Sequence, residues 1–216
     1  MFKGHYDDWR KSRMETIKKY MNEDFLKNKT LLELGCGFAD NSILFKQEFN
    51  NKILACDAKR EHLDTVNKTY PDISTFIFDC DKDKLLFNVD IILHWGVLYH
   101  LNPMSITSHL TDICKHCNIL LLESEILDSN GYDILQTNEE GYDQAANNIG
   151  CSPSQLYVEN ILETNNFNYK LILDPIINSF FHVYDWEITN DKSYKNGKRR
   201  FWICWKNTVD NPLKMI

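Results

Sequence analysis

The chain has 216 residues, a formal net charge of −7 and a hydrophobic fraction of 43%. This length and composition predict one globular domain with a sizeable apolar core. The negative charge disfavours binding to a phosphate backbone, no apolar run reaches the ~20 residues of a membrane span, and the N-terminus lacks a signal-peptide pattern. We therefore expect a cytoplasmic protein with no membrane partner.

The N-terminal two thirds of the chain predict alternating helices and strands. Apolar residues spaced three and four apart indicate a first helix at 6–28, which we expect to form a cap over the site. Strands are then predicted at 30–34, 51–57, 74–79, 89–93 and 118–123, with helices at 40–49, 58–70 and 103–116. This alternation predicts parallel βαβ units with right-handed crossovers. The near-continuous apolar run at 118–123 is typical of a strand covered on both faces.

The C-terminal third is less regular. Residues 125–150 are polar and without a clear period, and we expect them to form a lid insertion. Ser152 is predicted to cap a helix that Pro153 begins and that ends near 165. Strands follow at 169–173, 180–186 and 201–206, and the basic residues 195–200 read as a solvated hairpin loop around an Asn-Gly turn. No repeat or linker is visible, so residues 1–216 are predicted to form a single domain.

A glycine-containing turn follows the first predicted strand. Glu33 precedes Gly35 and Gly37, and the two glycines permit a sharp turn and the close approach of a ligand. The charge of Glu33 disfavours a pyrophosphate and suits a cationic group. Asp40 stands where a dinucleotide-binding fingerprint has its third glycine. The turn therefore predicts a site for a cationic nucleotide cofactor rather than for NAD.

Two further acids end predicted strands. Asp57 follows the glycines by about twenty residues, the distance at which an acid accepts hydrogen bonds from ribose hydroxyls in doubly wound folds. Asp79 ends the third strand, and the fourth leads into the segment 94–101, which contains two histidines, a tryptophan and a tyrosine.

This succession resembles motif I and the segments after it in the class I S-adenosylmethionine (SAM)-dependent methyltransferases. The resemblance covers residues 30–124 and implies a Rossmann-like α/β fold. That fold has a mostly parallel seven-stranded sheet, helices on both faces and a C-terminal antiparallel strand. SAM is the implied cofactor, with Asp79 at the position that holds the adenine amino group. The string Gly96–His100 resembles the subgroup with the tRNA wobble-uridine carboxymethylating enzymes, and it also occurs in many small-molecule methyltransferases.

The resemblance implies a set of site residues at the carboxyl edge of the sheet. The expected cofactor-binding residues are Glu33, Gly35, Cys36, Gly37, Asp57, Ala58, Asp79, Cys80, His94 and Trp95. Oxygen and most nitrogen acceptors must also lose a proton, and histidine titrates near neutrality. His100 and His94 are therefore candidate bases, and Tyr99 is a third catalytic candidate. No metal is predicted, because Cys114-x-x-Cys117 has no second pair of ligands.

The leading prediction is thus a SAM-dependent methyltransferase that acts on an oxygen or nitrogen atom of a small molecule. The basic cluster at 195–200 and the wobble-uridine resemblance keep a tRNA-modifying transferase open. A third alternative is a SAM-binding regulatory protein that has lost catalysis. The sequence does not identify the acceptor or the oligomeric state.

Overall fold

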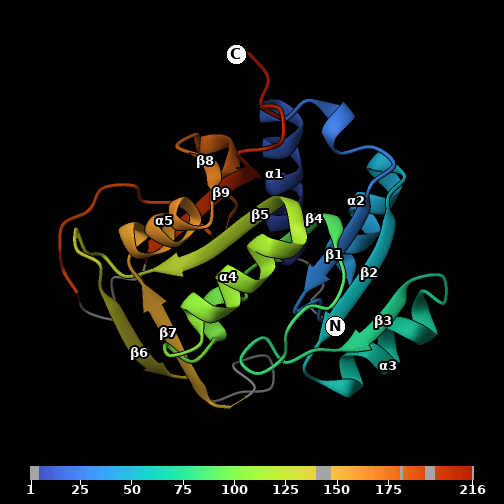
Figure 1. Ribbon diagram of the computed structural model, residues 1–216, viewed down its shortest axis with the longest axis horizontal. Coiled ribbons are helices and arrows are strands. Elements are labelled where there is room, and N and C mark those ends of the chain that lie inside the picture. Colours follow the sequence, from blue (N-terminus) through green and yellow to red (C-terminus); the bar gives the residue numbers. More distant parts are fainter. Residues whose placement is uncertain (1–4, 140–146, 181, 193–197, 216) are drawn as a thin grey trace.

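The computed structural model describes residues 5–139, 147–180, 182–192 and 198–215 (Figure 1). Its central sheet has seven strands in the order β3-β2-β1-β4-β5-β9-β8. They are β1 (Thr30–Leu34), β2 (Lys52–Asp57), β3 (Ser74–Ile77), β4 (Val89–Trp95), β5 (Cys117–Ile126), β8 (Phe167–Leu171) and β9 (Lys198–Lys206). The first five are parallel, and β9 pairs antiparallel with both β5 and β8. The predicted fold class is confirmed.

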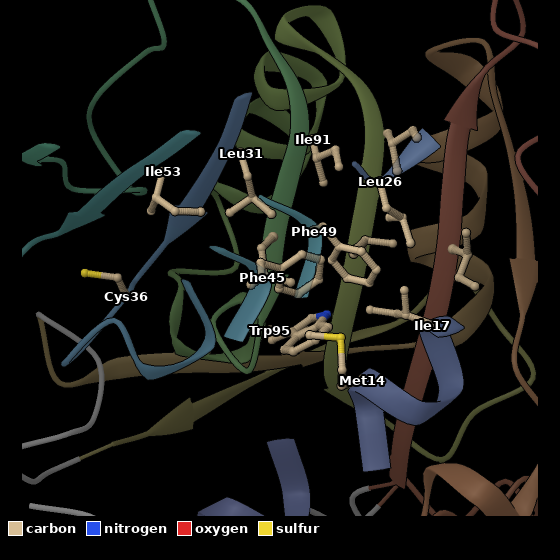
Figure 2. Packing of buried hydrophobic residues seen from close by; sticks show 14 of the residues in the cluster. Met14, Ile17, Leu26, Leu31, Cys36, Phe45, Phe49, Ile53, Ile91 and Trp95 are labelled. Atoms are coloured by element: carbon tan, nitrogen blue, oxygen red, sulfur yellow. The ribbon is translucent and has the colours of Figure 1, made fainter. Parts of the chain in front are cut away.

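Helices cover both faces of this sheet. The helices α1 (His5–Tyr20), α2 (Asp40–Phe49) and α3 (Arg60–Thr69) share one apolar cluster with it, and α4 (Ile106–His116) and α5 (Gln155–Thr164) share the other. In Figure 2, Met14 and Ile17 of α1 and Phe45 and Phe49 of α2 gather around Trp95 at the end of β4. The cap helix is therefore part of the core.

The strands alternate between these two clusters, as the pleat requires. In β4, Ile91 and Leu93 face the α1–α2 side, while Ile92 faces the α4 side. Both faces of the central strands are thus buried, which explains why their sequences are apolar runs rather than alternating patterns.

Several predicted boundaries are wrong. The first helix ends at Tyr20, and Asn22 then caps a short 3-10 turn, η1 (Glu23–Phe25). Ser154 caps α5 by accepting from the backbone of Tyr157, because the chain is still extended at residues 152 and 153. The described residues among 180–186, all but residue 181, contain no strand.

The polar insertion at 125–150 contains regular structure. Strand β5 continues to Ile126, and β6 (Ile134–Asn138) then pairs antiparallel with β7 (Ile149–Pro153), apart from the main sheet (Figure 1). Residues 140–146 and the predicted turn at 196–197 lie outside the described residues. All seven cysteines are buried and free. In the described part of the chain, no helix combines the length and the apolarity that a membrane span needs.

Candidate functional site

The turn after β1 contains three left-handed residues at alternate positions. Gly35, Gly37 and Ala39 have φ angles of +58°, +53° and +59°. Two backbone hydrogen bonds fix the turn: Cys36 N donates to the carbonyl of Cys56 on β2 at 2.9 Å, and Ala39 N donates to Cys36 O at 2.7 Å. Glycine enters the left-handed region without the Cβ penalty, so this sequence folds into a tight strand-to-helix turn.

Asp57, the last residue of β2, is hydrogen-bonded to this turn. Its Oδ2 accepts from the backbone N–H of Gly37 at 2.9 Å, and its Oδ1 accepts from Lys59 N at 2.8 Å. The ring nitrogen Nδ1 of His62 lies 3.3 Å from Oδ2. Because a carboxylate can accept about four hydrogen bonds, Asp57 retains capacity for further donors.

A cleft of about 220 Å³ opens beside these residues at the carboxyl edge of the sheet. Eight of the predicted site residues line it: Gly35, Cys36, Gly37, Asp57, Ala58, Asp79, Cys80 and His100. The lining also includes Arg10 of α1, which the sequence signalled only through the expected cap helix, and Gly96, which belongs to the Gly96–His100 string. Phe38 and His62 also line the cleft, and the sequence analysis did not single them out. The carboxyl ends of β1, β2, β3 and β4 and the helix before β1 therefore meet at one cleft.

Asp79 is fixed in a tight turn of its own. Its Oδ1 accepts from Asp81 N at 3.0 Å, and its Oδ2 lies 2.6 Å from Lys82 Nζ. Its backbone N–H donates to Asp83 Oδ2 at 2.8 Å. The turn holds Asp79 and the neighbouring Cys80 at the wall of the cleft.

Glu33 is not among the residues that line the cleft. Its carboxylate turns toward the start of α2, where Asn41 Nδ2 donates to it at 2.8 Å and Ser42 donates through its backbone N–H at 3.0 Å and through its hydroxyl. Burial raises the pKa of Glu33 to about 7 in spite of these donors. In this structure the Glu33 carboxylate anchors the start of α2 to β1 and does not line the cleft, so its assignment as a cofactor-binding residue stays a prediction.

His94 and Trp95 were expected at the edge of the sheet, but β4 continues through both. They point to opposite faces and into the core. His94 is fully buried, with its Nε2 2.9 Å from Nε2 of His109 on α4. Trp95 packs against the rings of Trp9, Phe45 and Phe201 at centroid distances of 5.7–6.0 Å. Neither lines the cleft, so this placement does not support His94 as a base or either residue as a cofactor contact.

His100 and Tyr99 belong to a short 3-10 turn, η2 (Leu98–His100), after β4. His100 lines the cleft, and its Nδ1 contacts the carboxylate of Glu139 from the insertion. Gly150 makes room for this contact, because a Cβ there would lie 2.7 Å from Glu139 Cδ and 2.6 Å from Tyr99 O. Tyr99 lies outside the cleft lining, and its ring contacts that of His100 at a tilt of 49°, with centroids 4.1 Å apart. No sequence signal indicated the partner Glu139.

The basic residues 198–200 do not form a solvated loop. They begin β9, and Arg200 is fully buried, donating to Gln155 Oε1 at 2.7 Å and to the carbonyl of Asp185 at 2.8 Å. Lys198 Nζ lies 2.6 Å from Asp185 Oδ2. The prediction of a solvated basic loop is wrong for residues 198–200. Among the described residues, no group of His, Cys, Asp and Glu is arranged to hold a metal ion.

Comparison with known proteins gives a fold but no sequence relative. No family model matches the chain, and no curated protein matches it. The N-terminal domain of EvdMO1, crystallised in the presence of SAH and D-fucose, is 14% identical with a TM-score of 0.68 over 94% of this chain and 83% of that one. A SAM-dependent methyltransferase from Mesorhizobium loti is 12% identical, with a TM-score of 0.66 over 90% and 98%. TehB from Haemophilus influenzae is 15% identical, with a TM-score of 0.59 over 95% and 63%.

These similarities define the fold class. The sheet order, the antiparallel β9 and the helices on both faces are those of the Rossmann-like class I methyltransferases. At 12–15% identity the similarity shows the fold alone. The argument for an activity must therefore come from the geometry of the cleft.

Proposed function

We propose that this protein is a SAM-dependent methyltransferase that transfers a methyl group to an oxygen or nitrogen atom of a small molecule. The observation that carries the proposal is the cleft in which Asp57 and the Gly35–Gly37 turn are hydrogen-bonded side by side. Parallel α/β sheets bind nucleotides at this carboxyl edge. Solved structures of the same fold contain SAH, the demethylated product of SAM.

The cleft residues fit such a cofactor. A Cβ built on Gly37 would meet no atom within 4 Å, so the space over this glycine is open to a ligand. Asp57 would hold the ribose hydroxyls with its remaining acceptor capacity, and Asp79 with Cys80 would hold the adenine. When bound, SAM supplies a methyl group activated by a sulfonium, and the protein contributes mainly alignment.

His100 is the base that the geometry favours. Because a carboxylate can only accept, the neutral imidazole would donate Nδ1–H to Glu139 and carry its lone pair on Nε2, and the ring lines the cleft. A base in this position removes a proton from a hydroxyl or amine acceptor. Glu139 fixes the tautomer and the ring orientation, so we assign it a positioning role.

The insertion supports a lid over this site. Besides Glu139, it provides Asn147, whose Nδ2 donates to Asp81 Oδ2 at 3.3 Å across the loop after β3. Asp81 and His100 both line the cleft. The insertion thus contacts two sides of the cleft, as a segment that excludes water from the reaction must.

A nucleic-acid acceptor is less well supported. The argument for it used the basic cluster, but Lys198 and Arg200 are buried and engaged within the fold. Phosphate binding depends on cations that can release counterions at the surface. We therefore favour the small-molecule acceptor.

Turnover experiments test this proposal. The protein, incubated with SAM carrying a labelled methyl group and a pool of metabolites, should yield labelled products. His100→Gln should lower the rate about 10²–10⁴-fold, the usual contribution of a general base, while SAH affinity stays the same. Glu139→Gln should lower the rate less. His116→Gln is the matched control, because His116 also faces an aspartate, Asp112, but outside the cleft. Full turnover in His100→Gln would refute the assignment of His100 as the general base. If the native protein binds SAH but transfers no methyl group, the regulatory alternative is favoured.

A further inference from the structure

The two carboxylate oxygens of Glu123, near the end of β5, differ in their hydrogen bonding. Its Oε1 accepts from Arg199 at 2.7 Å, from the hydroxyl of Tyr184 at 3.0 Å and from Arg13 at 3.3 Å. Its Oε2 is equally buried but has no hydrogen-bond partner among the described residues. Glu123 as a whole is 0% exposed. A buried carboxylate oxygen without a donor is costly, so Oε2 is an acceptor available to a donor that the described residues do not supply.

Glu123 is charged at neutral pH. Burial works against its ionisation, but the charges of Arg199 and Arg13 outweigh burial and lower the pKa to about 2. Oε2 is therefore part of a fixed anion that can accept a hydrogen bond.

Glu123 Oε2 lies beside Gly96, the first residue after β4. A Cβ built on Gly96 would lie 3.7 Å from Glu123 Oε2 and 3.7 Å from the hydroxyl of Tyr99, with no other described atom within 4 Å apart from its chain neighbours. We call this space, bounded by Gly96, Glu123 Oε2 and the Tyr99 hydroxyl, the Gly96 slot. Because Gly96 also lines the cofactor cleft, the slot adjoins the cleft.

The charge and hydrogen-bonding capacity of Glu123 Oε2 determine which chemical groups the slot can bind. Oε2 can only accept, so the occupant must donate. A carboxylate or phosphate would meet the charge of Glu123, whereas a group that becomes positive during the reaction would be stabilised by it. Nitrogen acquires positive charge as it is methylated.

We propose that the Gly96 slot binds the amino group of a nitrogen acceptor, with Glu123 Oε2 accepting its N–H. This inference rests on the proposed methyltransferase function and narrows it to amines. In the transfer, the acceptor N–C bond forms as the C–S bond of the cofactor breaks, and that electron pair returns to sulfur. The methylated nitrogen then loses a proton to His100 Nε2, and the product is a neutral amine.

Crystals of the full-length protein with SAH, soaked separately in methylammonium chloride and in sodium formate, test this assignment. Methylammonium should place its nitrogen within hydrogen-bonding distance of Glu123 Oε2, and formate should be absent from the slot. Formate in the slot, or a slot that methylammonium leaves empty, overturns the inference. Failure of SAH itself to bind would instead refute the proposed function on which the inference rests.

Variants distinguish binding in the Gly96 slot from effects of the neighbouring charged residues. Glu123→Gln should lower affinity for methylammonium at least tenfold and change SAH affinity less than about threefold, because a charge-assisted hydrogen bond is lost. Glu125→Gln is the control: Glu125 Oε2 also lies near Arg199, at 3.9 Å, but no contact places it at Gly96. If Glu123→Gln fails to fold, Gly96→Ala is the second variant: it places a methyl group 3.7 Å from Glu123 Oε2 and retains the Glu123 side chain, at a cost in backbone strain because Gly96 has a φ of +68°. Methylammonium binding that survives in Gly96→Ala overturns the inference.

Discussion

Gly37 and Asp57, twenty residues apart in sequence, are joined by a 2.9 Å hydrogen bond from the Gly37 N–H to Asp57 Oδ2. This bond couples the turn after β1 to the end of β2. One carboxylate thereby orients the glycine turn and faces the cleft. A change at Asp57 is therefore expected to act on ligand binding through both routes.

Asp57→Asn should weaken SAH binding at least tenfold. The substitution keeps the shape of the side chain but removes the charge, and a hydrogen bond to a charged group contributes about 1.5–3 kcal/mol. Calorimetric titration with SAH measures the loss. Asp72→Asn is the control, since Asp72 pairs with Lys46 at the surface and does not line the cleft. Equal affinities for the two variants would mean that Asp57 is not the ribose acid.

The two glycines of the turn should respond differently to alanine. Both have a positive φ, so each substitution costs about 1–2 kcal/mol of backbone strain. At Gly35 the new Cβ would also lie 2.7 Å from Val97 Cγ2, whereas at Gly37 it meets nothing within 4 Å. Gly35→Ala should therefore destabilise the fold more than Gly37→Ala, as measured by urea unfolding.

A double variant isolates this clash. Val97→Ala should restore part of the stability lost in Gly35→Ala and none of that lost in Gly37→Ala. Equal stabilities of the two single variants would contradict the packing of Gly35 against Val97.

Comparison of the sequence-based predictions with the structure shows which features the sequence could predict. The parallel strands, the glycine turn and Asp57 were predicted because each depends on local patterns: apolar runs, left-handed glycines and an acid at a strand end. The pairings of His100 with Glu139 and of Glu123 with Arg13 join residues 39 and 110 positions apart. Such contacts depend on how helices and insertions pack, and a single sequence carries no signal for them.

The wrong predictions for His94, Trp95 and the basic cluster also have a physical explanation. β4 continues two residues beyond the predicted end, so His94 and Trp95 alternate into the two cores instead of following the strand. The basic cluster was misread because lysine and arginine are usually exposed. Here Arg200 lies within β9, and the carbonyls of Asp185 and Trp186 satisfy its guanidinium.

His94 should make the fold sensitive to acid. Burial lowers its pKa to about 4, below the ordinary 6.5, so the folded state stays neutral while the unfolded chain becomes protonated. The stabilising effect of the neutral ring is complete above pH 6.5 and is lost as the pH falls toward 4. The slope is at most about 1.4 kcal/mol per pH unit for each such histidine.

His94→Gln keeps a partner for His109 and removes this titration. Urea unfolding between pH 7 and 4 should show a shallower decline for the variant than for the native protein. Measurement at pH 8 is the reference, since the native His94 is neutral there in both states. Parallel declines would contradict the burial of a neutral His94.

Binding of SAM and SAH, compared with NAD, by calorimetry and thermal shift tests the central claim most directly. The cleft should bind SAM and SAH, and a hundredfold excess over the dissociation constant should stabilise the fold by roughly 2.7 kcal/mol, while NAD produces no shift. A response to NAD and none to SAM or SAH would contradict the assignment of this cleft.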